Sequence, residues 1–581
     1  MTKPVIYQVF TRIFGNKAKE TVFSGDISQN GCGKFNDISP VALSALKGMG
    51  ITHMWYTGAI AHASLTDYTA FGIDNSFPEI TKGRAGSPYA IRDYYDVDPD
   101  LAVNVAERMK EFEELVNRTH EAGMKVIIDF VPNHVARTYK SKGKPSRVHD
   151  LGKDDVTSDP FNPQNNFYYI PGEAFQVPDG VTPYGAGIPF ENEKIHYKEF
   201  PARATGNDQF TARPGVNDWY ETIKLNYGVD YLNWKQCRFD PVPATWVRML
   251  EILTFWAKKG VDGFRCDMAE MVPVDFWEWV IKNIKIKFPH LTFIAEIYQP
   301  WEYRNYILRG GFDYLYDKEG MYNTLRDIIM WNKPAWTLSD CWRNLDNLDP
   351  YMLRFLENHD EIRLASGFFA GDCNRALPAM VVAATMNTGP VMIYMGQEVG
   401  EPAAGAQGFS GDDGRTSIFD YCVSPELQKW VNNGKFDGKK LNKEQQNLRV
   451  FYQKLLNLCN LSPAIRQGAF YDLMWVNNQF PAPDGSKIYV YLRHCREDQL
   501  LVICNFDQEN IHRFRLFIPL HAFGEMNLEA HLEFSLLNLI GEPCDAIFTG
   551  YNAAHEGIVM EMQPNGYAIY RLQANRPVLA D

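Results

Sequence analysis

Between residues 5 and about 400, short apolar runs alternate with segments in which apolar residues recur every three or four positions. The first pattern predicts buried strands and the second predicts amphipathic helices. Strands that alternate with helices run parallel, because each crossover returns the chain to the same end of the sheet. The strand candidates lie at residues 5–10, 51–58, 125–131, 260–267, 291–296, 312–317, 351–360 and 390–396. Eight such strands predict an α/β fold, the closed (β/α)₈ TIM barrel.

An open, doubly wound sheet is the competing architecture. Its usual mark is a Gly-rich phosphate loop after the first strand, and none follows residues 5–10. The helical patterns fit the barrel. One helix is expected around 103–121, closed by Gly123, and another over 276–288, capped by Asp275.

Two regions interrupt the alternation. Residues 135–225 are rich in Gly, Pro, Asn and Tyr and contain no long helical pattern, and beyond about 466 strand-like runs separated by turn residues take over. We therefore expect a barrel formed by 1–134 and 226–465, a loop-rich domain inserted at 135–225 after the third strand, and a C-terminal all-β sandwich domain at 466–581.

Charge and cysteine usage exclude several classes of partner. The chain has 58 Lys and Arg against 71 Asp and Glu, a net charge of −13, which disfavours nucleic acid and anionic membrane surfaces. Its ten cysteines include no C-x-x-C pair, so we expect reduced thiols and no zinc site. The N-terminus lacks an apolar signal core, and the longest apolar stretch, 376–395, is broken by proline and glycine. We expect a cytoplasmic protein, unless a targeting peptide has been removed, and make no prediction of its oligomeric state.

Functional side chains stand at the ends of four predicted strands. Arg265 and Asp267 are two positions apart on a strand and therefore share one face. The other strand ends carry Asp129, Glu296, and the pair His359 and Asp360. A single acidic residue there is often only a cap for the next turn. Several carboxylates at one barrel rim repel one another by roughly 1 kcal/mol per close pair, which is usually tolerated only where function needs it.

Four short motifs carry a family resemblance: DFVPNH (129–134), GFRCD (263–267), AE (295–296) and NHD (358–360). In this order and at these strand ends, they resemble the signature regions of the α-amylase family, glycoside hydrolase family 13. The resemblance extends over nearly the whole chain, including DYYDVDP (93–99) and GFSGDDGRTSIFDY (408–421). It implies an enzyme that hydrolyses α-1,4-glucosidic bonds of starch-type glucans or maltooligosaccharides with retention, with no required cofactor and with an oligo- or polysaccharide as its partner.

Retaining hydrolysis needs a carboxylate nucleophile and a protonated carboxyl about 5–5.5 Å apart. Arg265 on the same strand face is expected to lower the pKa of Asp267 by roughly 1–3 units, which makes Asp267 the nucleophile. Glu296 has no cation beside it in sequence and would feel two ionised aspartates, so we expect it to keep its proton and to act as general acid and then base.

The resemblance assigns further roles. Asp360 would bind sugar hydroxyls and favour the distorted ring, as the third catalytic carboxylate. His134 and His359 would hydrogen-bond hydroxyls, and Tyr89 would stack on the sugar at the cleavage point. Arg265 and Asp129 complete the expected substrate-binding group. The residue after Tyr89, often aspartate in relatives that act on small substrates, is Ala90, which argues mildly against a strict disaccharide enzyme.

The resemblance leaves a structural calcium doubtful. Asn133 matches an asparagine that ligates calcium in many α-amylases. The Lys-His that commonly follows the nucleophile is Glu270-Met271 here, and a thioether is a poor calcium ligand. We expect this site to be absent or rebuilt.

Three other functions compete with hydrolysis. A transferase or isomerase of the same family, for example one like trehalose synthase, would share every residue named above. A non-catalytic sugar-binding relative should lack at least one of the three carboxylates. A metal-dependent barrel hydrolase would need several histidines at strand ends, and only His134 and His359 qualify. The sequence does not decide chain-length preference or endo against exo action.

Overall fold

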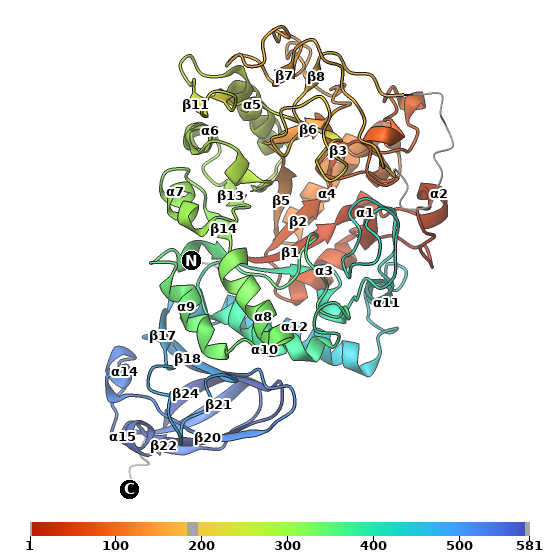
Figure 1. Ribbon diagram of the computed structural model, residues 1–581. Helices are drawn as coiled ribbons and strands as arrows, with labels where there is room; N and C mark the ends of the chain where they lie inside the picture. The colour runs from red at the N-terminus through yellow and green to blue at the C-terminus, as the bar shows by residue number, and fades with distance from the viewer. Residues whose placement is uncertain (1–2, 183–195, 576–581) are drawn as a thin grey trace.

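The computed structural model describes residues 3–182 and 196–575. At its centre, eight parallel strands form a barrel (Figure 1). They follow one another in the order β15, β14, β13, β12, β5, β2, β1, β16. Strand β16 pairs with β1, and a single parallel bridge between Arg354 and Val391 joins β15 to β16. The predicted TIM barrel is confirmed. Its strands are β1 (Val5–Phe10), β2 (His53–Thr57), β5 (Lys125–Phe130), β12 (Gly263–Cys266), β13 (Thr292–Ala295), β14 (Tyr314–Tyr316), β15 (Met352–Leu353) and β16 (Val391–Tyr394).

Each strand lies within one of the eight predicted runs, but most are shorter than predicted. The largest difference is in 351–360, where only Met352–Leu353 is strand. Further along this run the backbone turns around Asn358, whose Oδ1 accepts the N–H groups of Asp360 and Glu361 at 2.8 and 3.0 Å. This turn takes Asp360 out of line with the strand and toward the barrel mouth.

Helices surround the barrel. They are α1 (Thr11–Phe14), α2 (Ile27–Asn30), α3 (Pro40–Gly48), α4 (Arg108–Glu121), α5 (Ala244–Lys258), α6 (Val274–Lys287), α7 (Tyr303–Leu308), α8 (Asn323–Trp331), α9 (Leu338–Arg343), α10 (Leu377–Thr385), α11 (Pro425–Val431), α12 (Lys443–Leu461) and α13 (Pro463–Gln467). In α4, Phe112, Leu115 and Val116 form the buried stripe that the spacing predicted. Helix α10 is buried on all sides.

Two predicted helix starts are corrected. The helix expected from 103 begins at Arg108, after a 3₁₀ turn at Val105–Glu107. Asp275 is not the cap of α6: the N-cap is Pro273, and Asp275 lies in the first turn. Its carboxylate instead forms an ion pair with Arg309 of α7, while its negative charge still suits the helix N-terminus.

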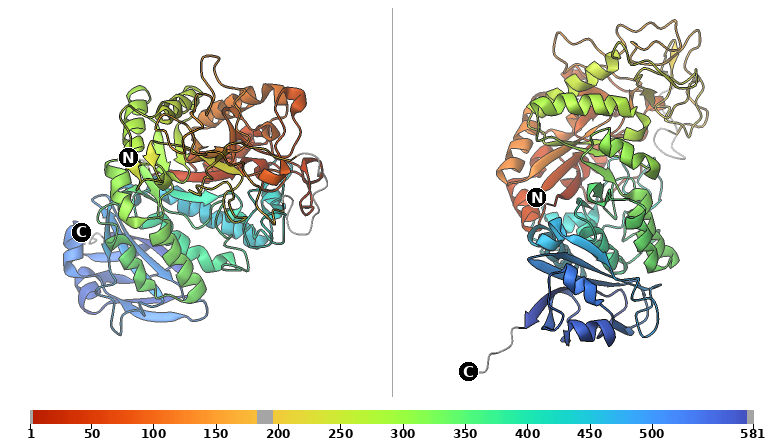
Figure 2. Two further views of the ribbon diagram at one scale, coloured as in Figure 1. Left: turned by 45° about the horizontal axis from the view of Figure 1, so that its top comes forward. Right: turned by 90° about the vertical axis from the view of Figure 1, so that its left-hand side faces the viewer.

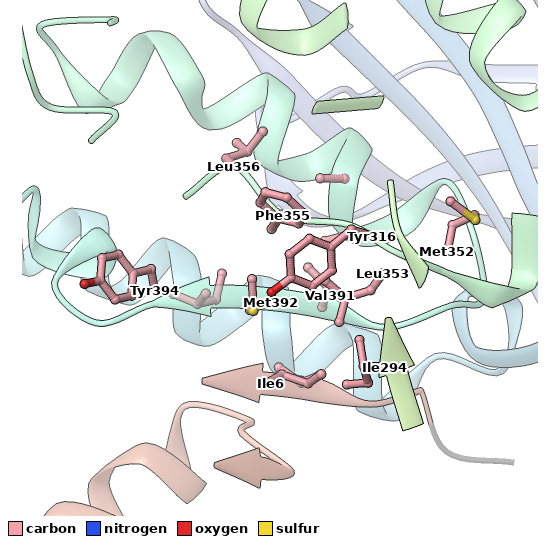
Figure 3. Close-up of a cluster of buried hydrophobic side chains, with 14 of the residues drawn as sticks. Ile6, Ile294, Tyr316, Met352, Leu353, Phe355, Leu356, Val391, Met392 and Tyr394 are labelled. Carbon is pink, nitrogen blue, oxygen red and sulfur yellow. The ribbon is translucent and has the colours of Figure 1, made fainter. Parts of the chain in front are cut away.

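The barrel interior is packed with apolar side chains (Figure 3). Ile6, Ile294 and Met392, from β1, β13 and β16, lie in one cluster and are at most 2% exposed. Tyr316 of β14 and Leu353 of β15 belong to the same cluster. Strands buried on both faces explain why the sequence shows continuous apolar runs in place of alternation. The barrel is therefore a core, and the site can lie only at its mouth.

After β5 the chain leaves the barrel and returns at α5. This excursion contains short antiparallel pairs: β6 (His134–Ala136) with β9 (Thr222–Lys224), β7 (Tyr169–Ile170) with β8 (Ala202–Arg203), and β10 (Val229–Asp230) with β11 (Gln236–Cys237). A further hairpin, β3 (Ile60–His62) with β4 (Ile91–Val97), follows β2. The excursion shares a small apolar cluster with Ile80 of the segment between β3 and β4, and contains a buried ion pair between Arg137 and Glu199 at 2.7 Å.

The C-terminal part is rich in strands. A six-stranded antiparallel sheet has the order β17 (Ala469–Asp472), β18 (Ile488–Cys495), β19 (Asp498–Asn505), β24 (Tyr567–Asn575), β21 (Glu533–Gly541), β22 (Ile547–Thr549). Strands β20 (His512–Leu516) and β23 (Ile558–Met562) form a separate pair, and two short helices, α14 (Leu520–Glu525) and α15 (Gly550–His555), accompany them. Figure 2 shows the excursion and this sheet at opposite ends of the molecule, with the barrel between them. The exact domain boundaries remain predictions.

Within the described ranges, no helix is both long and apolar enough to span a bilayer. All ten cysteines lie in these ranges and are free thiols.

A buried arginine next to the barrel closure gives a test of the fold. The guanidinium of Arg354 is fully buried, with Nε 2.9 Å from Asp317 Oδ2 and Nη2 against Asp349. The substitution Arg354→Met would leave two carboxylates without their cation, so we expect a loss of about 3–5 kcal/mol in the free energy of unfolding, seen as a large fall in Tm by calorimetry. The control Arg513→Met removes an ion pair in which the arginine is 78% exposed, and should change stability by less than about 1 kcal/mol. Equal Tm values for the two variants would contradict this account.

Candidate active site

The carboxyl ends of the barrel strands open into a cavity of about 270 Å³. Five of the predicted site residues line it: Tyr89, His134, Asp267, Glu296 and Asp360. The other three, Asp129, Arg265 and His359, are buried behind this wall and contact the residues that line it. The remaining lining residues are Lys82, Ser87, Trp219, Glu221, Thr222, Met268, Tyr298, Ile418 and Phe419.

Arg265 connects the two central carboxylates. Its Nη1 lies 2.7 Å from Asp267 Oδ1, and its Nη2 lies 2.8 Å from Glu296 Oε2. The same Nη1 is 3.5 Å from Asp129 Oδ1. Arg265 and Asp267 share a face of the chain at the end of β12, as the spacing predicted. Glu296 has no cation beside it in sequence, but strand β13 brings its carboxylate to the other fork of the same guanidinium.

Local backbone geometry fixes Glu296 further. Met268, which follows the predicted nucleophile, has a left-handed backbone with φ 43°. This turn directs the Met268 N–H to Glu296 Oε2, at 2.8 Å. The Tyr298 hydroxyl donates to the other oxygen, Oε1. A non-glycine residue in the left-handed region is uncommon, and such strain is typical of sites that must position a group.

Burial dominates the electrostatics of Asp267. It raises the pKa of Asp267 well above its usual range; Arg265 opposes this shift, and the nearby Glu296 adds to it. The predicted low pKa is therefore wrong for this site. The sequence showed the neighbouring guanidinium, but it did not show that three carboxylates share that guanidinium in a desolvated environment. Asp267 Oδ2 is buried and has no hydrogen-bond partner among the described residues.

Asp360 has the opposite environment. Its side chain is 36% exposed, and its Oδ2 lies 3.0 Å from His359 Nε2. Burial alone would raise its pKa, but His359 and Arg265 hold the pKa of Asp360 below its usual range. The ring of His359 is fixed by Gln8, whose amide nitrogen lies 2.7 Å from Nδ1, and by the Tyr89 hydroxyl.

Asp129 supports other residues and does not line the cavity. Its Oδ2 accepts the indole N–H of Trp55 at 3.1 Å, and its Oδ1 accepts the Tyr89 hydroxyl at 3.4 Å. Burial raises the pKa of Asp129, and Arg265 opposes that shift. Its direct role as a substrate-binding residue stays a prediction, whereas its contacts place it behind the ring of Tyr89.

His134 lines the cavity from the excursion. Its ring packs edge-on against Trp219, with centroids 5.3 Å apart. Burial, helped by Lys224, lowers the pKa of His134 to about 3. The imidazole is therefore neutral, with one nitrogen that donates a hydrogen bond and one that accepts.

Sequence reasoning missed several cavity residues. Tyr298 is two positions beyond Glu296 on the same extended segment, so the spacing alone offered a signal. Lys82, Trp219 and Glu221 come from irregular segments with no periodic pattern and offered none.

The residues around Asn133 do not fit a calcium ion. Its Oδ1 accepts from the ammonium of Lys224, which also lies 2.7 Å from Asp208 Oδ1 and donates to the Met271 carbonyl at 3.2 Å. A cation supplied by the chain thus already holds these oxygens together. In the part of the chain that the structure describes, no group of three or more His, Cys, Asp or Glu side chains is arranged to hold a metal ion.

The chain resembles known proteins along most of its length. Residues 8–291 match the family model described as "Alpha amylase, catalytic domain". The chain is 21% identical over 516 residues to Alpha-amylase 2 of Dictyoglomus thermophilum, covering 87% of this chain and 70% of that protein. It is 25% identical over 289 residues to an alpha-1,4-glucan:maltose-1-phosphate maltosyltransferase of Picrophilus torridus, covering 48% of this chain and 39% of that protein.

A solved structure supports the fold. The maltogenic alpha-amylase AmyB from Thermotoga neapolitana superposes with a TM-score of 0.60 at 20% identity, covering 98% of this chain and 99% of that chain.

Because the Lys224 ammonium lies against Asn133, we predict that the stability and activity of the protein do not depend on calcium. We expect EDTA to leave both Tm and activity unchanged, because Lys224 takes up the oxygens that a metal would need. Lys224→Met should lower the free energy of unfolding by about 3–5 kcal/mol, since it leaves buried acceptors and the Asp208 carboxylate unpaired. The matched control Lys140→Met removes an ion pair in which the lysine is 58% exposed. A large drop in wild-type Tm on chelation, reversed by calcium, would refute this.

The raised pKa of Asp267 predicts that its ionised carboxylate destabilises the fold near neutral pH. Below the unfolded-state value of about 3.9 the carboxyl is protonated in both states and has no effect; as pH rises through the raised folded pKa, ionisation destabilises the fold. Asp267→Asn should therefore raise Tm near pH 7 and leave it unchanged near pH 3.

Asp360→Asn is a control of opposite sign. The pKa of Asp360 is lowered in the folded state, so its ionised form stabilises the fold above the unfolded value and this contribution is lost as pH falls. The Asp360 variant should lose Tm near pH 7. If both variants shift Tm in the same direction, the electrostatic account of the site is wrong.

Proposed function

The chain belongs to the α-amylase family of glycoside hydrolases, and from this premise we propose that it cleaves α-1,4-glucosidic bonds of starch-type glucans or maltooligosaccharides with retention. One observation carries the proposal: two carboxylates on neighbouring strands, Asp267 and Glu296, lie 2.7 and 2.8 Å from the two forks of one buried guanidinium. Contact with one guanidinium brings both carboxylates to the same point of the cavity, as a mechanism with two carboxyl groups requires.

The first step uses the unpartnered oxygen of Asp267. That oxygen bonds to the anomeric carbon, the bond from this carbon to the leaving oxygen breaks, and Glu296 gives its proton to the leaving oxygen. In the second step Glu296 takes a proton from water, and the water oxygen replaces Asp267 at the same carbon. Two inversions give net retention. Arg265 contacts both carboxylates, so it can compensate whichever one is charged.

The surrounding residues favour an oxocarbenium-like transition state. Asp360 is held ionised and faces the cavity, where it can bind hydroxyls and offset positive charge on the sugar ring. The ring of Tyr89, fixed by Asp129 and His359, offers a flat surface for the sugar. Met268 and Tyr298 keep Glu296 directed at the leaving oxygen.

The names of similar proteins support an α-glucan substrate. They include α-amylases, a cyclomaltodextrinase and a trehalose-6-phosphate hydrolase, and structures with the same fold are titled as complexes with acarbose and maltose. An oligosaccharide is therefore the proposed partner. The maltosyltransferase relatives, 25% and 27% identical over about half of this chain, favour transglycosylation as the second candidate. All three carboxylates are present, which argues against a non-catalytic role.

Product analysis separates these candidates. We expect maltoheptaose to yield products that first appear as α-anomers by proton NMR, with net hydrolysis, and expect trehalose and sucrose to react slowly. New oligosaccharides or disaccharides without net hydrolysis would move the assignment to the transferase, and a first β-anomer would exclude retention.

The two carboxylates should respond differently to the leaving group. Glu296→Gln should lower kcat/KM on maltoheptaose by about 10²–10⁴-fold, the usual size of a general-acid contribution, but should lower kcat/KM much less on α-glucosyl fluoride, because kcat/KM reports the first step and fluoride leaves without a proton. Asp267→Asn should lose activity on both substrates. If Asp267→Asn keeps near-normal turnover, or Glu296→Gln loses equally on both, these roles are misassigned.

A further inference from the structure

An ion pair that this mechanism does not use lies in the wall of the cavity. Lys82 Nζ is 2.9 Å from Glu221 Oε1, and the two side chains are 13% and 7% exposed. Both line the same cavity as Asp267 and Glu296. Lys82 comes from the loop before Tyr89, and Glu221 stands immediately before β9, so two separate segments bring these charges to the site.

One oxygen of Glu221 lacks a partner. Among the described residues that line the cavity, the buried carboxylate oxygens without a hydrogen bond are Glu221 Oε2 and Asp267 Oδ2. A buried acceptor without a donor destabilises a protein by about 1–3 kcal/mol unless water, an ion or a ligand completes it. Asp267 Oδ2 is the oxygen that attacks the sugar. By the same reasoning, Glu221 Oε2 is an acceptor for a sugar hydroxyl.

Lys82 supplies the complementary donors. An ammonium has three N–H groups, and the contact with Glu221 takes one of them. The ammonium also lies over the ring of Tyr220, 5.3 Å from its centroid, which keeps the side chain in place. The pair thus presents an acceptor and donors side by side, and neighbouring hydroxyls of a sugar ring match that arrangement.

The ion pair of Lys82 and Glu221 lies on one wall of the cavity. Trp219 and Thr222, close to Glu221 in sequence, line the cavity with His134 from the excursion. Met268 and Tyr298, which hold the acid that protonates the leaving oxygen, line it from the barrel. The ion pair therefore lies on the excursion wall of the cavity, and the groups that hold Glu296 lie on its barrel wall.

The free hydroxyls of a sugar decide how well it satisfies this charged pair. A terminal sugar has all of its ring hydroxyls free. An internal sugar has one of them bound in the next glycosidic link and would leave part of the charged pair unsatisfied.

We propose that Lys82 and Glu221 recognise the hydroxyls of the terminal, non-reducing sugar, and that they make the enzyme act at chain ends. This inference rests on the proposed function, because it assumes that α-glucans are the substrates. Glu221 accepts from one hydroxyl through Oε2, while Lys82 donates to another. Neither residue takes part in bond cleavage, so both determine specificity.

The test compares free and blocked chain ends. The substrates are p-nitrophenyl maltoheptaoside and the same compound with an ethylidene group on its non-reducing end. We expect the wild-type protein to cleave the free compound and to cleave the blocked one about tenfold more slowly or worse, because a lost hydrogen bond to a charged group corresponds to about that factor. Glu221→Gln and Lys82→Met should raise KM for the free compound by a similar factor and reduce the discrimination against the blocked one.

A binding measurement makes the outcome independent of catalysis. In an Asp267→Asn background, which binds without turnover, Glu221→Gln should weaken the Kd for maltotriose by calorimetry about tenfold. The matched control is Asp74→Asn, which makes the same acid-to-amide change in an ion pair with Lys140 whose side chains are 51% and 58% exposed. It should change neither Kd nor KM.

Two results would overturn the inference: equal cleavage of free and blocked substrates by the wild-type protein, or unchanged Kd in the Glu221 and Lys82 variants with Tm unaltered. Failure of the wild-type protein to cleave any α-glucan would instead refute the proposed function, and the Kd comparison would still decide the role of the ion pair.

Discussion

The buried guanidinium of Arg265 is the interaction on which the site depends. It has no exposed surface, it contacts Asp267, Glu296 and Asp129, and the rings of Trp55, Tyr89 and Tyr316 lie 5.3–5.6 Å from it. A planar fork holds two carboxylates at a defined spacing, which the point charge of a lysine cannot do. The aromatic shell excludes water and strengthens each of these contacts, but it also makes unpaired charge unfavourable. Burial with one cation for three acids therefore raises the pKa of both Asp267 and Asp129.

The barrel could be predicted because short stretches of the sequence show the pattern of its buried strands. Strands buried on both faces appear as uninterrupted apolar runs, and all eight were found. Their ends could not be predicted, because a strand ends where its neighbour stops offering partners, and that depends on register. In 351–360 the apolar pattern continues past Leu353, yet β15 ends there and the ladder ends with the bridge between Arg354 and Val391. The cap of α6 was misassigned for a similar reason: Asp275 is a good capping residue, but the preceding Pro273 already has the extended conformation that precedes the helix.

The site was predictable only as far as the motifs reach. Arg265 lies near the end of β12, Asp267, Glu296 and Asp360 come after strands, and parallel strands bring their ends to one rim. Their pKa values were not predictable in the same way. Adjacency in sequence showed a cation beside Asp267, while burial and the sharing of that cation are properties of the assembled rim. Contacts between irregular segments, such as Lys82 with Glu221, have no local sequence signal at all.

The excursion and the barrel rim depend on each other through Lys224. This lysine lies on β9, just after Glu221, and its ammonium holds Asn133 at the end of the β5 segment and the Met271 carbonyl beyond β12. The segment that carries the excursion wall is thereby fixed to the barrel segments that carry Asp129 and Asp267. A bound metal would tie this wall to the rim only when occupied, whereas a lysine does so in every folded molecule. The shape of the cavity on the excursion side therefore follows from folding alone, which is what a recognition element made of two distant side chains requires.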